Sequence, residues 1–209
     1  MTLTRSHKRF FEQVRDLQVF RSIVVLNGRV PDPSFFAESE LPVIAVDGAT
    51  NSLLRQGIRP ELVVGDLDSV DLATRRDLSV VHLPDQSQSD FEKALAHLTK
   101  LHLMPAIVVG IGGGYIDHVI NNVNIFLNSG CIFYDPPIMG YVLRQNSIHS
   151  FSLPVQSKVS LMGIPFAVVS TCGLKWNLER TKLHFPGQNS CFNRTATEQF
   201  SIEVHEGSQ

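Results

Sequence analysis

The sequence predicts an α/β chain in two parts: an N-terminal open, mostly parallel sheet domain with helices, and a C-terminal all-β sandwich domain. Its 209 residues are enough for one large or two small domains. Short apolar runs alternate with helical patterns up to residue 136, and beyond Pro136-Pro137 the helical period disappears. We therefore expect an α/β domain at residues 1–136 and a β-sandwich domain at residues 137–209.

Six short apolar runs in the N-terminal part are predicted to be strands. Their nearly continuous Val and Ile content is typical of strands that are buried on both faces, as in a parallel sheet covered by helices. The six runs are Ser22–Leu26, Val43–Val46, Leu62–Val64, Val80–Leu83, Ala106–Val109 and Cys131–Tyr134.

Apolar residues at helical spacing predict helices between these strands. Phe91, Leu95 and Leu98 form one such stripe, and Ser89 or Asp90 is placed to cap its start. Another stripe is Val119, Val123 and Phe126, followed by the stop signal Asn128-Ser129-Gly130. Phe10, Phe11, Val14 and Leu17 form a stripe before the first strand, which predicts a docked N-terminal helix. Alternation of strands and helices in this manner is typical of βαβ units.

The C-terminal part reads as short strands separated by Gly and Pro. Several of these segments alternate with period two, which is typical of a small sandwich or barrel. The expected strands are Gly140–Arg144, Ser147–Leu153, Lys158–Met162, Phe166–Ser170 and Gln199–His205.

Composition excludes several classes of protein. Apolar residues make up 43% of the chain, which argues against disorder. A formal net charge of −2 argues against a nucleic-acid partner, and no apolar run reaches the ~20 residues of a membrane span. No apolar run follows the basic residues near the N-terminus, so no secretory signal is expected. Cys131, Cys172 and Cys191 are widely spaced, which favours free thiols in a reducing compartment and a cytoplasmic location.

Carboxylates follow successive predicted strands. Asp47 comes after one strand, Asp66 and Asp68 after the next, and Asp90 lies at the start of a predicted helix. Ligands bind at the carboxyl ends of strands in open α/β sheets. Asp66 and Asp68 would point to the same side of an extended backbone. Each aspartate alone is equally well a loop residue or helix cap, but four together favour a cation, and Mg²⁺ is the hard ion that fits.

A glycine run offers a second candidate site. Gly112-Gly113-Gly114 precedes a predicted helix N-terminus, where backbone N–H groups can approach phosphate. The run is neither a Walker A motif nor a GxGxxG fingerprint, and a flexible turn is the alternative. Asp117 and His118 follow this run. They are interpreted either as a helix cap and a surface histidine, or as residues that contact the ligand.

Four segments in order resemble the motifs of the thiamin pyrophosphokinase family. They are Val46–Ser69, Asp85–Ala94, Gly110–Asn124 and Ser170–Leu178, and the resemblance extends from about residue 22 to residue 205. It implies an α/β catalytic domain that binds ATP and Mg²⁺, and a β-sandwich that binds thiamin and forms a homodimer with active sites between subunits. The implied reaction is attack of the thiamin hydroxyl on the β-phosphorus of ATP, which gives thiamin diphosphate and AMP.

The resemblance also implies roles for individual residues. The metal-binding positions are Asp47, Asp66, Asp68 and Asp90, of which Asp66, Asp68 and Asp90 are also catalytic. The nucleotide-binding positions are Gly112, Gly113, Asp117 and His118, supported by Asn51 and Gln86. Trp176 matches a tryptophan that stacks on the thiamin pyrimidine, and Ser190 and Asn193 match a pair that hydrogen-bonds it. A tryptophan in the sandwich core is the alternative for Trp176.

Some positions depart from the family pattern. Tyr115 stands where the family usually has an arginine, and Phe192 occupies a normally small polar position. These departures affect ATP affinity and the pyrimidine contacts, while the acidic positions are complete.

Two alternative functions remain: a metal-dependent phosphoesterase, and a non-enzymatic thiamin or nucleotide sensor. If the chain is a kinase, either Asp66 or Asp90 is a candidate for the general base.

Overall fold

The computed structural model describes residues 10–11, 14, 19–70 and 76–207. The chain divides into two compact units, Met1–Val142 and Leu143–Gln209. The division lies six residues beyond the boundary expected at 136, because the chain after Pro137 adds one more strand to the first sheet. Among the described residues, no helix is long and apolar enough to cross a bilayer.

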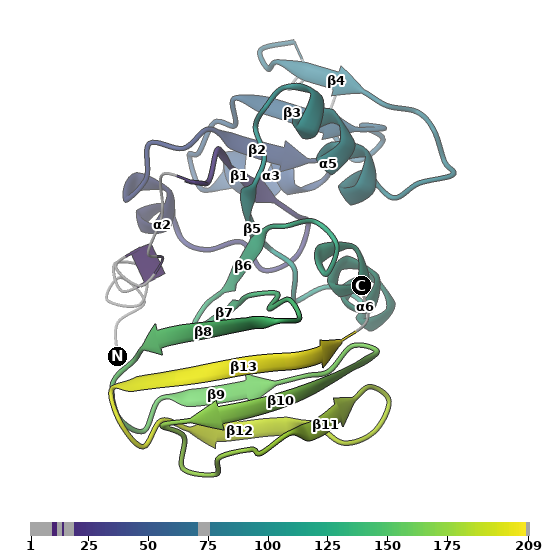
Figure 1. Ribbon diagram of the computed structural model, residues 1–209. Helices are drawn as coiled ribbons and strands as arrows, with labels where there is room; N and C mark the ends of the chain where they lie inside the picture. The colour runs from purple at the N-terminus through teal and green to yellow at the C-terminus, as the bar shows by residue number, and fades with distance from the viewer. Residues whose placement is uncertain (1–9, 12–13, 15–18, 71–75, 208–209) are drawn as a thin grey trace. The chain divides into compact units, whose positions relative to one another are not determined.

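The first unit is built on a seven-stranded sheet of order β4-β3-β2-β1-β5-β6-β7 (Figure 1). Neighbouring strands are parallel except for β7, which runs antiparallel to β6. The strands are β1 Ser22–Val25, β2 Val43–Val46, β3 Leu62–Gly65, β4 Val80–His82, β5 Ala106–Val109, β6 Ile132–Asp135 and β7 Ile138–Gly140. All six strands expected in this part are therefore confirmed.

Helices of the first unit pack on both faces of this sheet. Alternate residues of β1 enter two separate cores: Ile23 packs in the core that contains Phe35, and Val24 in the core that contains Phe91. The helices are α2 Pro33–Ala37, α3 Ala49–Arg55, α5 Asp90–Lys100 and α6 Ile116–Phe126. The two longer helices confirm the predicted stripes, whereas the short α2 and α3 were not predicted.

The N-terminal apolar stripe is described only in part. Phe10, Phe11 and Val14 are buried in the same core as Phe35, and the Phe10 ring packs at a tilt against Tyr134 of β6, with 4.3 Å between ring centroids. Leu17 lies outside the described residues. The three described side chains therefore close one face of the sheet.

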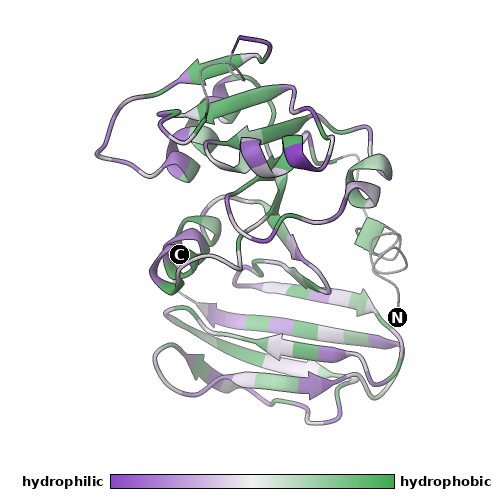
Figure 2. Cartoon of the chain, turned by 180° about the vertical axis from the view of Figure 1, so that it is seen from behind, coloured by the Kyte–Doolittle hydropathy of each residue, from purple (hydrophilic) through white to green (hydrophobic). Residues whose placement is uncertain are grey.

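The second unit contains two antiparallel sheets, with strand order β11-β10-β13-β8 in one and β12-β9 in the other. Val159 of β9 packs with Val169 and Ile202 of the larger sheet in one core, as expected of a sandwich. Hydropathy alternates along these strands, whereas the strands of the parallel sheet are almost uniformly hydrophobic (Figure 2). The strands are β8 Ser147–Ser152, β9 Lys158–Leu161, β10 Phe166–Cys172, β11 Thr181–His184, β12 Ser190–Arg194 and β13 Gln199–Gly207.

One expected strand of the C-terminal part was wrong, and two strands were not predicted. The expected strand Gly140–Arg144 is absent beyond Gly140, which ends β7 of the first unit. The strands β11 and β12 were not predicted. Buried and exposed residues do not alternate along β12, because Cys191 and Phe192 are both exposed at an irregularity in the pairing of β12 with β9.

Candidate active site

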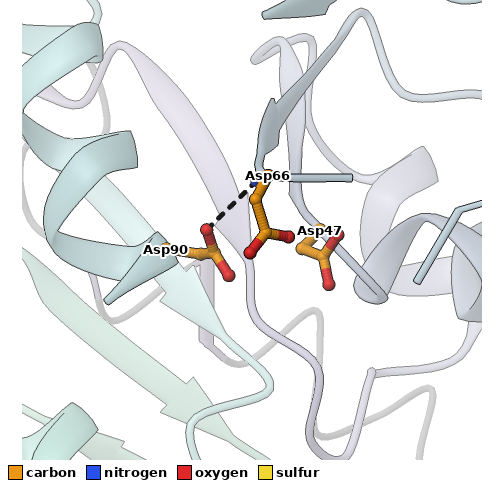
Figure 3. Close-up of side chains that lie close together, drawn as sticks. All are labelled: Asp47, Asp66 and Asp90. Carbon is orange, nitrogen blue, oxygen red and sulfur yellow. Dashed lines mark hydrogen bonds between the residues drawn. The ribbon is translucent and has the colours of Figure 1, made fainter. Parts of the chain in front are cut away.

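Three carboxylates meet at the carboxyl edge of the parallel sheet. Asp47 directly follows β2, Asp66 follows β3, and Asp90 is the first residue of α5. The strands β2 and β3 are neighbours, so their ends lie side by side, and α5 packs against both. One carboxylate oxygen of each residue lies within 4.8 Å of the others (Figure 3). Three of the four expected acidic positions are therefore brought together.

Asp68 lies outside this group of three oxygens. The expectation that Asp66 and Asp68 point to the same side assumed an extended backbone. Leu67 between them instead has φ of 67°, in the left-handed region, and its side chain is buried. Asp68 is exposed, its carboxylate accepts a hydrogen bond of 2.9 Å from the Ser69 hydroxyl, and its N–H donates to Asp66. In this conformation Asp68 contributes a backbone donor, and not a carboxylate, to the group.

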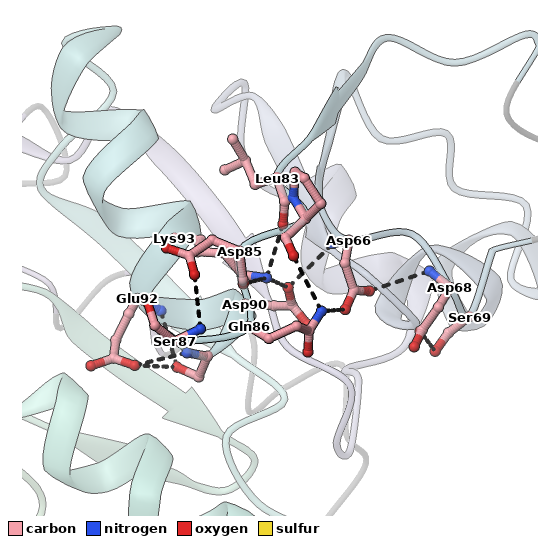
Figure 4. Close-up of polar contacts among 12 residues, drawn as sticks. Asp66, Asp68, Ser69, Leu83, Asp85, Gln86, Ser87, Asp90, Glu92 and Lys93 are labelled. Atoms are coloured by element: carbon pink, nitrogen blue, oxygen red, sulfur yellow. Dashed lines mark hydrogen bonds and ion pairs between the residues drawn. The ribbon is translucent and has the colours of Figure 1, made fainter.

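Lys93 supplies a buried positive charge beside the carboxylates. Its Nζ lies 2.6 Å from Asp90 Oδ1 and donates to the carbonyls of Leu83 and Asp85 at 3.0 Å each (Figure 4). The side chain is 5% exposed, so solvent screens this ion pair weakly. Lys93 therefore offsets part of the repulsion between the aspartates and ties the loop before α5 to the helix. Sequence reasoning missed this residue, and its spacing of three from Asp90 was the available signal.

Asp66 is held as an anion by hydrogen bonds. Gln86 Nε2 donates to its Oδ2 at 2.9 Å, and the Asp68 N–H donates to its Oδ1 at 3.2 Å. These two bonds hold the pKa of Asp66 below its usual value. The N–H of Asp66 in turn donates to Asp90 Oδ1 at 3.3 Å. The two carboxylates are thus positioned relative to each other by the backbone.

Asp47 has the opposite electrostatic character. Burial raises its pKa, with smaller increases from the charges of Asp90 and Asp68, and hydrogen bonding from Ser69 and Gly48 offsets only part of this rise. Its Oδ1 is buried and has no hydrogen-bond partner among the described residues. A buried carboxylate oxygen without a donor, beside two other carboxylates, fits a bound cation. The oxygen-only set suits Mg²⁺.

The polar residues expected to support the nucleotide make contacts within the chain. Asn51, in α3, donates from Nδ2 to the backbone carbonyl of Ser69 at 2.7 Å, which ties the loop after β3 to that helix. Gln86 contacts Asp66 directly, as described above. Both amides therefore shape the loops around the carboxylates.

The glycine loop, residues 110–115, joins β5 to α6. Gly113 has φ of 89°, a conformation that favours glycine. Tyr115 occupies the N-cap position of α6, so Asp117 is a residue of the first helical turn and not the expected cap. Asp117 Oδ1 accepts a 2.9 Å hydrogen bond from the N–H of His118, and both side chains are exposed. The structure does not bring these two residues into the carboxylate group.

The expected thiamin-contacting residues lie in the second unit. Trp176 is 55% exposed, which contradicts the alternative of a core tryptophan, and Lys175 Nζ lies 4.7 Å from its ring centroid. Asn193 is 2% exposed: its Oδ1 accepts from the Trp176 N–H at 3.2 Å and its Nδ2 donates to the Trp176 carbonyl at 2.7 Å. Asn193 therefore holds the backbone of Trp176. Ser190 begins β12 and is half-buried.

Comparison with protein families gives two matches in chain order. Residues 35–134 match the thiamin pyrophosphokinase catalytic domain, and residues 148–208 match the vitamin B1 binding domain of the same family. The first match contains the three carboxylates and the glycine loop. The second contains Trp176, Ser190 and Asn193.

Individual relatives and solved structures agree with these matches. The chain is 25% identical over 220 residues to thiamine pyrophosphokinase 3 of Oryza sativa subsp. japonica, which covers 88% of this chain and 82% of the relative. It is 26% identical over 183 residues to thiamin pyrophosphokinase 1 of Caenorhabditis elegans, covering 77% of this chain and 74% of the relative. In fold it resembles yeast thiamin pyrophosphokinase, with a TM-score of 0.70 and 16% sequence identity, covering 91% of this chain and 84% of the yeast chain. It also resembles Bacillus subtilis thiamine pyrophosphokinase, with a TM-score of 0.66 and 22% sequence identity, covering 88% of this chain and 94% of the bacterial chain.

Proposed function

The chain belongs to the thiamin pyrophosphokinase family, and we propose that it transfers the pyrophosphoryl group of ATP to the hydroxyl of thiamin, giving thiamin diphosphate and AMP. The activity is that of a transferase in thiamin diphosphate biosynthesis. The observation that carries the proposal is the group formed by Asp47, Asp66 and Asp90, which lies inside the catalytic-domain match. Pyrophosphoryl transfer depends mainly on positioning and on neutralising phosphate charge, which such a group is suited to organise.

We propose that Asp47, Asp66 and Asp90 hold Mg²⁺. The unpartnered Oδ1 of Asp47 supports this assignment, as does the ionised state favoured for Asp66. When bound, the cation neutralises phosphate oxygens and makes the phosphorus more electrophilic. Asp68, which sequence reasoning placed in the same cage, contributes its N–H to Asp66 and its charge to the surroundings of the site.

The general base is proposed to be Asp66 or Asp90. A base must accept the proton of the thiamin hydroxyl, and donors stabilise the anionic form of both carboxylates: Gln86 and the Asp68 N–H for Asp66, and Lys93 for Asp90. Lys93 and the Asp66 N–H both contact Oδ1 of Asp90. These contacts fix the orientation of the Asp90 carboxyl, and a fixed orientation favours directional proton transfer.

The second unit is proposed to bind thiamin through Trp176 and to form a homodimer. An exposed tryptophan offers a flat face for stacking on a heterocycle. Large apolar side chains of this unit are exposed, and such surface is typical of an interface. They are Ile148 (68%), Phe192 (69%), Phe185 (53%) and Met162 (52%). Sedimentation at micromolar concentration is expected to give twice the chain mass of 23.2 kDa.

Exposed cysteines support a cytoplasmic location. Cys172 and Cys191 are free and exposed, which suits a reducing compartment. We include this location in the proposal.

A turnover assay tests the proposed function. The protein is incubated with ATP and Mg²⁺, with and without thiamin, and AMP and thiamin diphosphate are quantified. We expect AMP and thiamin diphosphate in equal amounts, and only when thiamin is present. AMP or phosphate released without thiamin would instead indicate a metal-dependent phosphoesterase. Binding of thiamin without any product would indicate a non-enzymatic sensor.

A further inference from the structure

The loop after β1 is packed directly against the glycine loop after β5. A Cβ atom at Gly28 would overlap the carbonyl oxygens of Gly110 and Gly112, so only glycine permits this approach. The N–H of Arg29 donates to the Gly112 carbonyl at 2.6 Å. A Cβ on Gly113 would lie 2.9 Å from the Cβ of Arg29. The first atoms of the Arg29 side chain are therefore fixed against the glycine loop.

This contact lies where the order of the sheet reverses. The strands β1 and β5 are hydrogen-bonded neighbours, while β2 lies on the other side of β1 and β6 on the other side of β5. The loops that leave β1 and β5 thus lead to opposite sides. In open α/β sheets this arrangement leaves a crevice at the carboxyl edge, in which ligands bind.

The Arg29 guanidinium is available to a ligand. Its side chain is 64% exposed, and its charged partner in the described structure is Asp135, with 3.7 Å between Nη1 and Oδ1. That separation is longer than a hydrogen bond. Lys93, by contrast, is 5% exposed and has three close oxygen neighbours.

Arg29 is also the one lysine or arginine among the described residues that directly follow the strand ends at this edge. These residues are 26–32, 47–48, 66–70, 83–89 and 110–115. An anionic ligand in the crevice would therefore meet one exposed guanidinium.

The spacing between this position and the carboxylates suits a nucleotide. Asp47 and Asp66 follow β2 and β3, the first and second neighbours of β1 on the side away from β5. Neighbouring strands are about 4.8 Å apart, so the carboxylates and the crevice between β1 and β5 are separated by about 10 Å. The Arg29 guanidinium lies against Asp135, at the end of β6 on the far side of β5. A polyphosphate chain that reaches from the carboxylates toward β5 meets the guanidinium when this exposed side chain turns from Asp135 toward β1.

We propose that Arg29 binds the α-phosphate of ATP and, after transfer, the phosphate of the leaving AMP. This inference rests on the proposed function. The thiamin hydroxyl attacks the β-phosphorus, the bond from that phosphorus to the α,β-bridging oxygen breaks, and the oxygen leaves with AMP while the hydroxyl proton passes to a carboxylate. The guanidinium faces the negative charge that develops on AMP. Its planar set of donors matches two phosphate oxygens.

The test compares AMP and adenosine binding to Arg29→Gln by titration calorimetry on the full chain. We expect Arg29→Gln to weaken AMP binding about tenfold and to leave adenosine binding unchanged, because only AMP carries the phosphate. Arg29→Lys is expected to recover part of the AMP affinity. The matched control is Arg59→Gln: Arg59 is exposed and precedes β3, at the opposite edge of the sheet, and this variant is expected to bind AMP as the unchanged chain does.

Kinetics provide the second readout. The KM for ATP is expected to rise about tenfold in Arg29→Gln, with the KM for thiamin unchanged. Unchanged AMP affinity in Arg29→Gln would overturn the inference, as would an equal loss of AMP and adenosine binding, since that result indicates a distorted loop. Absence of thiamin-dependent turnover in the unchanged chain would contradict the proposed function, and the AMP–adenosine comparison remains a separate result.

Discussion

The acidic edge of the first unit and the surface around Trp176 in the second unit are built in opposite ways. At the acidic edge two of the three carboxylates are held by other side chains: Gln86 donates to Asp66, and the buried Lys93 contacts Asp90. Around Trp176 the aromatic rings are open. Trp176 is 55% exposed and Phe192 69% exposed, and each has a lysine Nζ near its ring, at 4.7 Å and 5.4 Å.

This difference indicates where each site obtains its order. The acidic edge is organised by the chain itself, through strand ends, a helix start and a buried cation, so it is positioned before any ligand arrives. The surface around Trp176 fixes only the backbone of the tryptophan, through Asn193. In the proposed function, thiamin or a second subunit would cover its ring. Substitutions at the acidic edge and at the surface around Trp176 should therefore have different effects on the protein.

The largest effect is expected from Asp66→Asn. Loss of one charge from the group of three carboxylates should lower kcat by roughly 10²- to 10³-fold, as removal of a single electrostatic contact to a transition state does elsewhere. Asp68→Asn should have a smaller effect, because its carboxylate lies outside the group. Both variants should keep their fold by circular dichroism. Equal losses would place Asp68 in the cage, and near-normal turnover in both variants would refute the metal assignment.

The next largest effect is expected from Lys93→Met. Removing one partner of a buried ion pair leaves an uncompensated carboxylate and two carbonyls without their donor, which should cost about 3 kcal/mol of unfolding free energy in urea titrations. Lys100→Met, an exposed lysine of the same helix, is the control and should change stability little. Adding Asp90→Asn to Lys93→Met should recover part of the loss. Equal stability of the two lysine variants would show that Lys93 does not organise this edge.

A smaller, selective effect is expected from Trp176→Ala. The KM for thiamin should rise about tenfold, since one stacking surface is lost, while the KM for ATP changes little. Phe185→Ala removes an aromatic ring of nearly equal exposure, 53%, and serves as the control. A core residue would behave differently, with a loss of about 3–5 kcal/mol of stability and impaired use of both substrates. That pattern would contradict the open character of this surface.

The smallest effect is expected from Asp47→Asn in the metal-free protein. Burial raises the pKa of Asp47 above the unfolded value of 3.8, so between the two pKa values the folded chain binds more protons than the unfolded chain. The contribution of this carboxyl to stability is therefore greatest at low pH and decreases as the pH rises through the native pKa. Asp47→Asn should raise Tm by about 1–2 °C at pH 7 and by less near pH 4. A lower Tm at pH 7 would mean that the charge stabilises the empty site.

Much of the fold could be predicted because the central parallel strands β1, β2, β3 and β5 are buried on both faces. Short apolar runs marked all six strands expected in the first sheet, and the Ser89 cap of α5 forms a full capping box with Glu92. The short helices α2 and α3, of five and seven residues, are too short to show a helical stripe. In β12, Phe192 has φ of 58°, and this left-handed residue breaks the period-two pattern.

The candidate site could be predicted where it depends on topology. Asp47 and Asp66 meet because neighbouring parallel strands end at one edge, and this follows from their positions after two strands. The outward turn of Asp68 depends on the conformation of Leu67, which no local pattern indicates. Lys93 and Arg29 were missed because a lysine in a helix and an arginine in a loop both resemble ordinary surface residues. Their roles arise from contacts with segments distant in the sequence.

Trp176 has an optical consequence, because it is the chain's single tryptophan. All indole emission comes from one position, and its 55% exposure predicts emission close to that of tryptophan in water. The nearby Lys175 ammonium should attract iodide, so this anion should quench the emission more efficiently than the neutral quencher acrylamide. Trp176 emission would thus report the proposed binding of thiamin, or the proposed subunit association, without any added label.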